Sequence, residues 1–321
     1  MYHIGVDLGG TSIKAGIVSA DWKILLTDSV PTDLPRSAGE IAESIYRLVL
    51  QLLETGCIAW DETDSIGVGI PGTVNQKTGI VEYANNFDFK NTAFLELLRG
   101  KFEKPVFMEN DAQSAAWGEH IAGAGRGHHS MLAVTLGTGV GGGIILDDKL
   151  WHGMNYAAGE VGHMVIRMHG RDCTCGRKGC FEAYASVTAL CRMAAEAAEK
   201  YPESVLMKLK QSEEGLNGRN IISAVRNHDK AAEEAYEQYT DYLALGLVNL
   251  INIFQPEILV IGGGLSGAGE FFLHSVVRKV KPAVYSRYSE DNTEIRLAAL
   301  GNDAGIIGAA ALGMLHPSAA E

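Results

Sequence analysis

Short apolar runs separated by glycine-rich turns dominate the chain. One such run covers residues 3–8, the turn Gly9-Gly10 follows, and a second run begins at Ala15. Runs of four to eight apolar residues bounded by turn residues are typical of strands, so residues 3–18 are predicted to form a β-hairpin. The plan recurs later, with a strand at 130–136, a glycine turn at 137–143 and a strand at 144–146. Two copies of one strand plan indicate a duplicated fold with a cleft between its halves.

Apolar residues three and four positions apart predict the helices. A helix capped near Ser37 places Ile41, Ile45 and Leu48 on one face, and the longest helix runs from Ala231 until Pro256 stops it. Further helices are expected to start near residue 112, to cover 183–200, 201–211 and 270–280, and to run from a cap at 301–305 through Leu312. Further strands are expected at 23–27, 65–70, 105–109, 257–262 and 294–300. This mixture of helices and strands predicts an α/β protein.

Composition and charge exclude several classes of protein. The chain has 321 residues, a length that favours two domains, and its 46% hydrophobic and 21% charged residues are ordinary for a globular protein. Its net charge of −12, with no basic cluster, argues against a nucleic-acid-binding surface. The apolar runs fall short of the ~18–20 residues that a membrane span needs. Because the sequence begins directly with a strand, we expect no signal peptide and a cytoplasmic protein.

One histidine and three cysteines form the strongest chemical signal. His163, Cys173, Cys175 and Cys180 follow the pattern H-x9-C-x-C-x4-C. Three thiols and an imidazole can bind one Zn²⁺ tetrahedrally. The alternatives are a disulfide, which a reducing cytoplasm disfavours, or simply buried cysteines. Since the pattern leaves no obvious open coordination position, we expect a structural zinc site, which would hold the flanking carboxylates of Glu160 and Glu182 in place.

Two further positions carry candidate chemistry. The tip of the first hairpin holds Asp7, Thr11 and Lys14, which a plain turn does not require. It is not a Walker loop, because a strand rather than a helix follows. Asp111 stands where a strand meets a helix, so its carboxylate is either a helix N-cap or a general base at the end of a strand. Taken alone, the local pattern favours the cap.

Taken together, these motifs resemble the ROK family of sugar kinases, and most of all its bacterial ATP-dependent glucokinases. The resemblance covers the whole chain and rests on seven pieces in family order: Asp7-Leu-Gly-Gly-Thr-Ser-Ile-Lys14, Gly67-Val-Gly-Ile-Pro-Gly72, Glu109-Asn-Asp111-Ala, residues 136–143, Glu160-Val-Gly-His163, the cysteine loop through Glu182, and residues 261–266. It implies the two-lobed, actin-like and ribonuclease-H-like ATPase fold. The expected domains are a small one (1–118 plus about 300–321) and a large one (119–299) with the zinc loop at 160–182.

The resemblance also implies a role for each site residue. Asp111 would be the general base that accepts the proton of the sugar's 6-hydroxyl during attack on the γ-phosphate of ATP. His163 would bind zinc through one ring nitrogen and face the sugar with the other. The sugar site would comprise Asn86, Asn110, Asp111, Glu160, His163, Glu182 and Gly72. The ATP and Mg²⁺ site would comprise Asp7, Gly9, Gly10, Thr11, Lys14, Gly137, Thr138, Gly139, Gly263 and Gly264, with the turn at Asn302-Asp303 near the nucleoside.

Two positions depart from the family pattern. Gln113 stands where the family usually has Asn, and Asn86-Phe-Asp-Phe89 replaces Asn-Leu-Gly-Trp of many glucokinases. The first departure predicts changed packing, and the second leaves the preferred hexose open among glucose, N-acetylglucosamine, N-acetylmannosamine, mannose, fructose and allose. The alternatives in other classes are a sugar-responsive repressor and a catalytically inactive sugar binder. The partners expected are a hexose, ATP and further copies of the chain in a dimer or tetramer.

Overall fold

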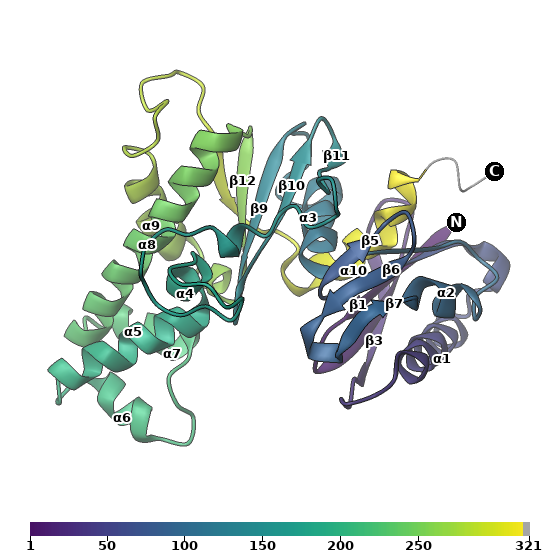
Figure 1. Ribbon diagram of the computed structural model, residues 1–321, viewed down its shortest axis with the longest axis horizontal. Helices are drawn as coiled ribbons and strands as arrows, with labels where there is room; N and C mark the ends of the chain where they lie inside the picture. Colours follow the sequence, from purple (N-terminus) through teal and green to yellow (C-terminus); the bar gives the residue numbers. More distant parts are fainter. Residues whose placement is uncertain (317–321) are drawn as a thin grey trace. The chain divides into compact units, whose positions relative to one another are not determined.

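A computed structural model describes residues 1–316 (Figure 1). Residues 317–321, which belong to the expected small domain and to a polar C-terminal tail, lie outside this description. The chain folds into two compact units. Unit 1 comprises Met1–Met131, Gly143–Gly159 and Ala299–Glu321, and unit 2 comprises Leu132–Gly142 and Glu160–Ala298.

The first sheet is built around the predicted N-terminal hairpin. Its five strands lie in the order β3-β2-β1-β4-β8, where β1 is Tyr2–Leu8, β2 is Ser12–Val18, β3 is Ile24–Pro31, β4 is Thr63–Ile70 and β8 is Val106–Asn110. The first three strands are antiparallel, whereas β4 and β8 run parallel to β1. The register places Asp7 beside Lys14 at the end of the hairpin. The hairpin prediction is confirmed.

Two helices and a small sheet share a hydrophobic core with the first sheet. The helices are α1 (Ala38–Gly56) and α2 (Phe94–Arg99), and the small sheet consists of β5 (Thr73–Asn75), β6 (Ile80–Ala84) and β7 (Phe89–Thr92). Ser37 caps α1 as expected, because its hydroxyl accepts a hydrogen bond from the backbone N–H of Glu40. The predicted apolar face of α1 packs into one core with the large sheet and the aromatic residues of β7 and α2.

The helix α10 (Ala304–Ala310) lies against β1, β4 and α3 (Asp111–Ala122) with almost no side-chain layer between backbones. A Cβ atom on Gly5 or Gly67 would overlap a backbone carbonyl oxygen of α10. Between the two helices, a Cβ on Gly118 or Gly308 would likewise overlap a carbonyl oxygen of the facing helix. Glycine is therefore required at these positions by the close approach of two backbones.

The second five-stranded sheet has the order β11-β10-β9-β12-β13 (Figure 1). Its strands are β9 (Met131–Leu136), β10 (Val140–Leu146), β11 (Lys149–Leu150), β12 (Ile258–Gly263) and β13 (Glu294–Leu297). In this sheet the hairpin β9–β10 is extended by β11 beyond β10 and by β12 and β13 beyond β9. The first sheet has the same plan, with β3 beyond β2 and with β4 and β8 beyond β1. The predicted α/β fold with duplicated mixed sheets is confirmed.

The glycine turn predicted at 137–143 is shorter than expected. Only residues 137–139 lie between the strands, and Gly141, Gly142 and Gly143 belong to β10. Gly143 is needed inside the strand because a Cβ there would overlap the side chain of Ala116. A run of glycines therefore marks close packing here as well as a turn.

The helices of unit 2 are α4 (Glu182–Ala185), α5 (Val187–Lys200), α6 (Val205–Gln211), α7 (Gly218–Arg226), α8 (Lys230–Phe254) and α9 (Glu270–Val280). The helix predicted over 183–200 is split at Ser186, whose extended backbone and hydroxyl cap α5. The sequence pattern gave no prediction of α2 or α7. The long helix α8 packs against α5 and α9 (Figure 1).

Within residues 1–316, no helix combines the length and the apolar character required to cross a membrane.

We predict that Gly308→Ala destabilises the protein by about 3 kcal/mol, because overpacking of a close contact costs about 1–3 kcal/mol or more. The added methyl group would overlap the Ser114 carbonyl oxygen of α3. The free energy of unfolding in urea measures this effect.

Gly39→Ala is the matched control for this prediction. A Cβ at Gly39, in the first turn of α1, meets no described atom within 4 Å. Its stability should stay unchanged or rise by up to about 1 kcal/mol, since alanine is the better helix former. Equal effects of the two substitutions would show that the backbone contact between α3 and α10 is unimportant.

Candidate active site and metal centre

The tip of the first hairpin is held by the segment that follows β3. The hydroxyl of Thr32 donates to the Gly9 carbonyl at 2.7 Å, and the backbone N–H of Thr32 donates to the Thr11 carbonyl. Thr32 is fully buried, and its contribution was not predicted from the sequence. These contacts fix the backbone of the turn that was expected to approach phosphate groups.

Asp7 carries a partly buried carboxyl group at this tip. The pKa of Asp7 lies above its usual value, because the effect of burial outweighs the opposite effect of the Lys14 charge. A Cβ on Gly305 of α10 would lie 3.2 Å from the Asp7 carboxyl carbon, so glycine leaves the space beside this group open. A divalent cation at this position would favour the ionised form of Asp7.

Asn110 and Asp111 stand at the junction of β8 and α3. Asn110, rather than Asp111, caps the helix, since its side-chain oxygen accepts a hydrogen bond from the backbone N–H of Gln113. The cap role that the local pattern favoured for Asp111 is therefore wrong. Asp111 is the first residue of α3, and its carboxylate accepts a hydrogen bond from the backbone N–H of Ala112 at 2.8 Å.

The amide of Asn110 also ties the strand end to the turn after β4. Its Nδ2 atom donates to the carbonyl oxygen of Gly72 at 3.0 Å. Gly72 has a φ of 104°, and a Cβ there would overlap the Tyr83 carbonyl oxygen. Gly72 is therefore needed for its backbone conformation, which presents its carbonyl group to Asn110. Asn86, the other predicted sugar-binding residue of unit 1, is exposed in the short 3-10 helix Asn85–Phe87, and its side chain lies close to Gly10.

In unit 2, the turn at Gly137–Gly139 is attached to the start of α4. The Glu182 carboxylate accepts a hydrogen bond from the backbone N–H of Val140 at 3.0 Å, and a Cβ on Gly139 would overlap that carboxylate. The Thr188 hydroxyl donates to the carbonyl oxygen of Thr138. A predicted sugar-binding residue thus contacts the turn that was predicted to hold ATP.

The third glycine turn borders a cavity of about 380 Å³. Gly263 has a φ of 90°, and a Cβ there would overlap the Leu136 backbone. Gly264 lines the cavity together with residues of α7, including Arg219 and Arg226. The cavity is lined from two elements that lie far apart in the sequence, so sequence reasoning could not predict the contribution of α7.

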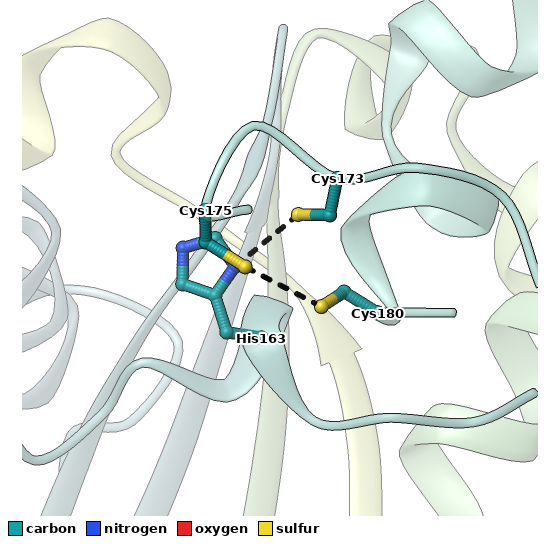
Figure 2. A group of neighbouring side chains, drawn as sticks. All are labelled: His163, Cys173, Cys175 and Cys180. Atoms are coloured by element: carbon teal, nitrogen blue, oxygen red, sulfur yellow. Dashed lines mark hydrogen bonds between the residues drawn. The ribbon is translucent and has the colours of Figure 1, made fainter. Parts of the chain in front are cut away.

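The four predicted metal ligands converge on one point (Figure 2). Their ligand atoms all lie within 4.8 Å of one another. The sulfur of Cys173 is 3.6 Å from Nδ1 of His163, and the sulfurs of Cys175 and Cys180 are also 3.6 Å apart. A zinc tetrahedron with bonds of about 2.3 Å to sulfur and about 2.0–2.1 Å to nitrogen has edges of roughly 3.5–3.8 Å. The donor set fits a zinc ion, and the two separations of 3.6 Å match edges of such a tetrahedron.

The thiol groups of this cluster have unequal environments. Burial raises the pKa of Cys173 and of Cys180, whereas a hydrogen bond from the Arg177 backbone lowers the pKa of Cys175. A metal ion would bind all three as thiolates. The other ring nitrogen of His163, Nε2, lies 3.9 Å from a carboxylate oxygen of Glu160.

The loop that carries the cluster is anchored to the core of unit 2 by the residue after Cys180. Phe181 is fully buried, and a Cβ on Gly246 of α8 would overlap its ring. Glu182 comes next, and one of its carboxylate oxygens lies 3.7 Å from the Cys173 sulfur and 3.2 Å from the Thr174 hydroxyl. The Glu182 side chain therefore connects the metal-ligand loop with the turn at Gly139.

A model of the ROK family matches residues 3–314, nearly the whole chain. The chain belongs to the ROK family.

Named relatives and solved structures extend this result. A glucokinase of Thermotoga maritima is 37% identical over 314 residues, which cover 96% of each chain. The crystal structure of a ROK family glucokinase from Streptomyces griseus, in complex with glucose and AMPPNP, is similar with a TM-score of 0.83 and 36% identity over 97% of this chain and 99% of that one. A ROK hexokinase from Thermus thermophilus has a TM-score of 0.80 and 29% identity, with 97% of both chains covered.

One buried group of this ROK protein was not predicted from the sequence. Glu109, which is 2% exposed, accepts hydrogen bonds from three donors: the backbone N–H of Asn110, the amide of Gln76 and, at 2.6 Å, the Nε2–H of His152. An acidic residue at the end of a strand gives no sign of a partner 43 positions later. The signal available was a charged residue inside the otherwise apolar run 105–109.

We predict that the purified protein contains about one zinc ion per chain, and that Cys175→Ser removes it, because the cluster would lose one of its four ligands. Elemental analysis of the protein after gel filtration measures the metal content.

Cys57→Ser controls for loss of a thiol, since Cys57 is an exposed residue at the end of α1. Its metal content should equal that of the wild type. Retention of stoichiometric zinc by Cys175→Ser would refute the ligand assignment.

Proposed function

We propose that the chain transfers the γ-phosphate of ATP to the 6-hydroxyl of glucose, with Asp111 as the general base. The chain is a sugar kinase of the ROK family. The observation that carries the finer proposal is the position of Asp111. It lies at the carboxyl end of a parallel strand and at the start of α3, while its neighbour Asn110 caps the helix.

This position suits a carboxylate that accepts a proton. The N-terminus of a helix is a favourable place for a negatively charged group, and Asp111 is the first residue of α3. The hydrogen bond from Ala112 holds one carboxylate oxygen in place. In the proposed reaction, the carboxylate accepts the proton of the sugar's 6-hydroxyl as this oxygen attacks phosphorus, and the bond from the γ-phosphorus to the ADP oxygen breaks.

Phosphate binding is assigned to the backbone of glycine turns in both units. The assigned residues are Gly9, Gly10, Thr11 and Lys14 in unit 1, and Gly137, Thr138 and Gly139 in unit 2. Phosphate oxygens would accept hydrogen bonds from backbone N–H groups, hydroxyls and the Lys14 ammonium group. The N–H groups of Gly9 and Gly137 donate to the carbonyl oxygens of Ser12 and Gly139, so these two glycines shape the turns. Gly263 and Gly264 are assigned to the nucleoside. Asp7 is the residue proposed to hold Mg²⁺, which would neutralise phosphate charge when bound.

Sugar recognition is assigned to uncharged and acidic groups that hydrogen-bond hydroxyls. In unit 1 these are Asn86 and Asn110, and the amide of Asn110 is held by the Gly72 carbonyl group. In unit 2 they are Glu160, His163 and Glu182. A site built from such groups discriminates between similar polyols better than apolar contact does. The metal cluster supports this assignment, because zinc bound by His163 and the three cysteines would fix the loop that leads to Glu182.

We expect Asp111→Asn to lower kcat by about 10²–10⁴-fold, because the amide cannot accept the proton. Asparagine keeps the size of the side chain and an oxygen for the Ala112 contact. Sugar affinity should change by less than about tenfold, as one hydrogen-bonding group is replaced by another. A coupled assay of ADP release measures kcat, and calorimetry measures sugar binding.

Asp61→Asn is the control for this substitution, since Asp61 is exposed in a short 3-10 helix of unit 1. It should retain wild-type kcat. If Asp111→Asn also turned over at the wild-type rate, Asp111 would have no part in proton transfer.

A panel of hexoses tests the substrate. We expect kcat/KM for glucose to exceed that for N-acetylmannosamine, N-acetylglucosamine, mannose, fructose and allose. If kcat/KM is higher for a 2-acetamido sugar than for glucose, that sugar replaces glucose as the proposed substrate. The kinase assignment would stand. Absence of phosphorylation across the panel, combined with specific DNA binding at moderate salt, would favour a sugar-responsive regulator.

The proposal includes a reducing compartment such as the cytoplasm. All five cysteines lie within the described residues and are free thiols. The zinc assignment needs the three cysteines of the loop in this reduced state.

A further inference from the structure

The segment from His152 to Ala158 is a closed loop on unit 1. The backbone N–H of Ala158 donates to the carbonyl oxygen of His152 at 3.1 Å, and the rings of His152 and Tyr156 lie 6.2 Å apart. Gly153 and Tyr156 adopt φ values of 71° and 60°. The loop therefore has its own internal contacts, and it ends two residues before Glu160.

Two side chains from the β8–α3 junction hold this loop at its two ends. At the first end, the buried carboxylate of Glu109 accepts a 2.6 Å hydrogen bond from Nε2 of His152. At the other end, the amide of Gln113 donates to the carbonyl oxygen of Ala158 at 3.0 Å. The side chain of Glu109 is 3% exposed and Gln113 is 4% exposed, so water competes little for either contact.

The same junction carries the residues assigned to sugar binding and proton transfer. Glu109 directly precedes Asn110, and its other carboxylate oxygen accepts a hydrogen bond from the Asn110 backbone at 2.7 Å. Gln113 is the residue whose backbone N–H is capped by Asn110. The contacts that hold the loop thus originate on either side of Asn110 and Asp111.

We propose that His152 and Gln113 are positioning residues for sugar binding, which clamp the 152–158 loop onto the β8–α3 junction and thereby hold the backbone that leads to Glu160. The proposal rests on the proposed hexose kinase function. It explains the departure at Gln113, because asparagine is one methylene shorter and would not span the distance from α3 to the Ala158 carbonyl group.

Asp111 itself should be affected much less by loss of the clamp. Its contact with the Ala112 N–H and the cap formed by Asn110 are both made within the junction. The expected consequence is a change in KM for the sugar with little change in kcat, and an unchanged KM for ATP. A role in stability alone would leave both KM values unchanged.

Steady-state kinetics of three variants test the proposal. His152→Ala should raise KM for the hexose about tenfold, the size of effect that loss of a buried, charge-assisted hydrogen bond produces, with kcat within about threefold. His152→Gln should restore KM to within about threefold, because its Nε2 amide can donate in place of the imidazole Nε2–H. Gln113→Asn should raise KM for the hexose about fivefold through loss of the other contact.

Gln76→Ala is the matched control. Gln76 also donates to Glu109, at 2.9 Å, but it lies between β5 and β6, and its amide otherwise donates to the carbonyl oxygen of Met108 in β8. If Gln76→Ala raises KM for the hexose as much as His152→Ala, the effect comes from the strand end in general and the clamp is refuted. An unchanged KM in both His152→Ala and Gln113→Asn also refutes it, as does a failure of His152→Gln to restore KM.

Hydrogen–deuterium exchange of the ligand-free protein separates this proposal from the proposed function. Exchange in residues 152–159 should be faster in His152→Ala and Gln113→Asn than in the wild type, and unchanged in Gln76→Ala. This outcome would support the clamp even if no hexose were phosphorylated. Absence of phosphorylation would count only against the proposed hexose substrate. Equal exchange in all four proteins would overturn the clamp even in an active enzyme.

Discussion

The close contact of the α10 backbone with the first sheet and with α3 is the constraint on which unit 1 depends. Glycines of β1 and β4 let this helix lie directly on the sheet, and Gly118 and Gly308 let it lie directly on α3. A helix this close cannot shift without collision, so the ends of β1 and α3 are held at fixed positions. These two ends carry Asp7 and Asp111, the two acidic residues assigned to phosphoryl transfer.

In unit 2, the side chain of Glu182 serves a comparable purpose. One of its oxygens accepts the Val140 N–H beside the glycine turn, while the other faces Cys173 and Thr174 of the metal-ligand loop. A single carboxylate, itself assigned to the sugar, thus contacts the elements assigned to ATP and to zinc. This makes the loop more than a separate stabilising module, because its conformation bears on the turn at Gly139.

The sequence predicted those features that depend on local pattern. The N-terminal hairpin, the capped helix α1 and the long helix α8 follow from hydrophobic spacing and from Ser37 and Pro256. The four metal ligands could be grouped because they lie within eighteen positions. The pattern could not reveal pairings between distant residues, such as Glu109 with His152 or Thr32 with Gly9. It also misjudged Asp111, because two adjacent residues could each cap α3 and only the backbone shows that Asn110 does so.

The burial of Phe181 against Gly246 has a thermodynamic consequence for the metal centre. In small zinc modules the free energy of metal binding is spent largely on folding the chain around the ion. Here Cys180 is placed beforehand by a ring that the core of unit 2 already encloses. Less conformational entropy is lost on coordination, so a larger share of the binding free energy becomes affinity, and the apoprotein keeps a folded body ready to take up the ion.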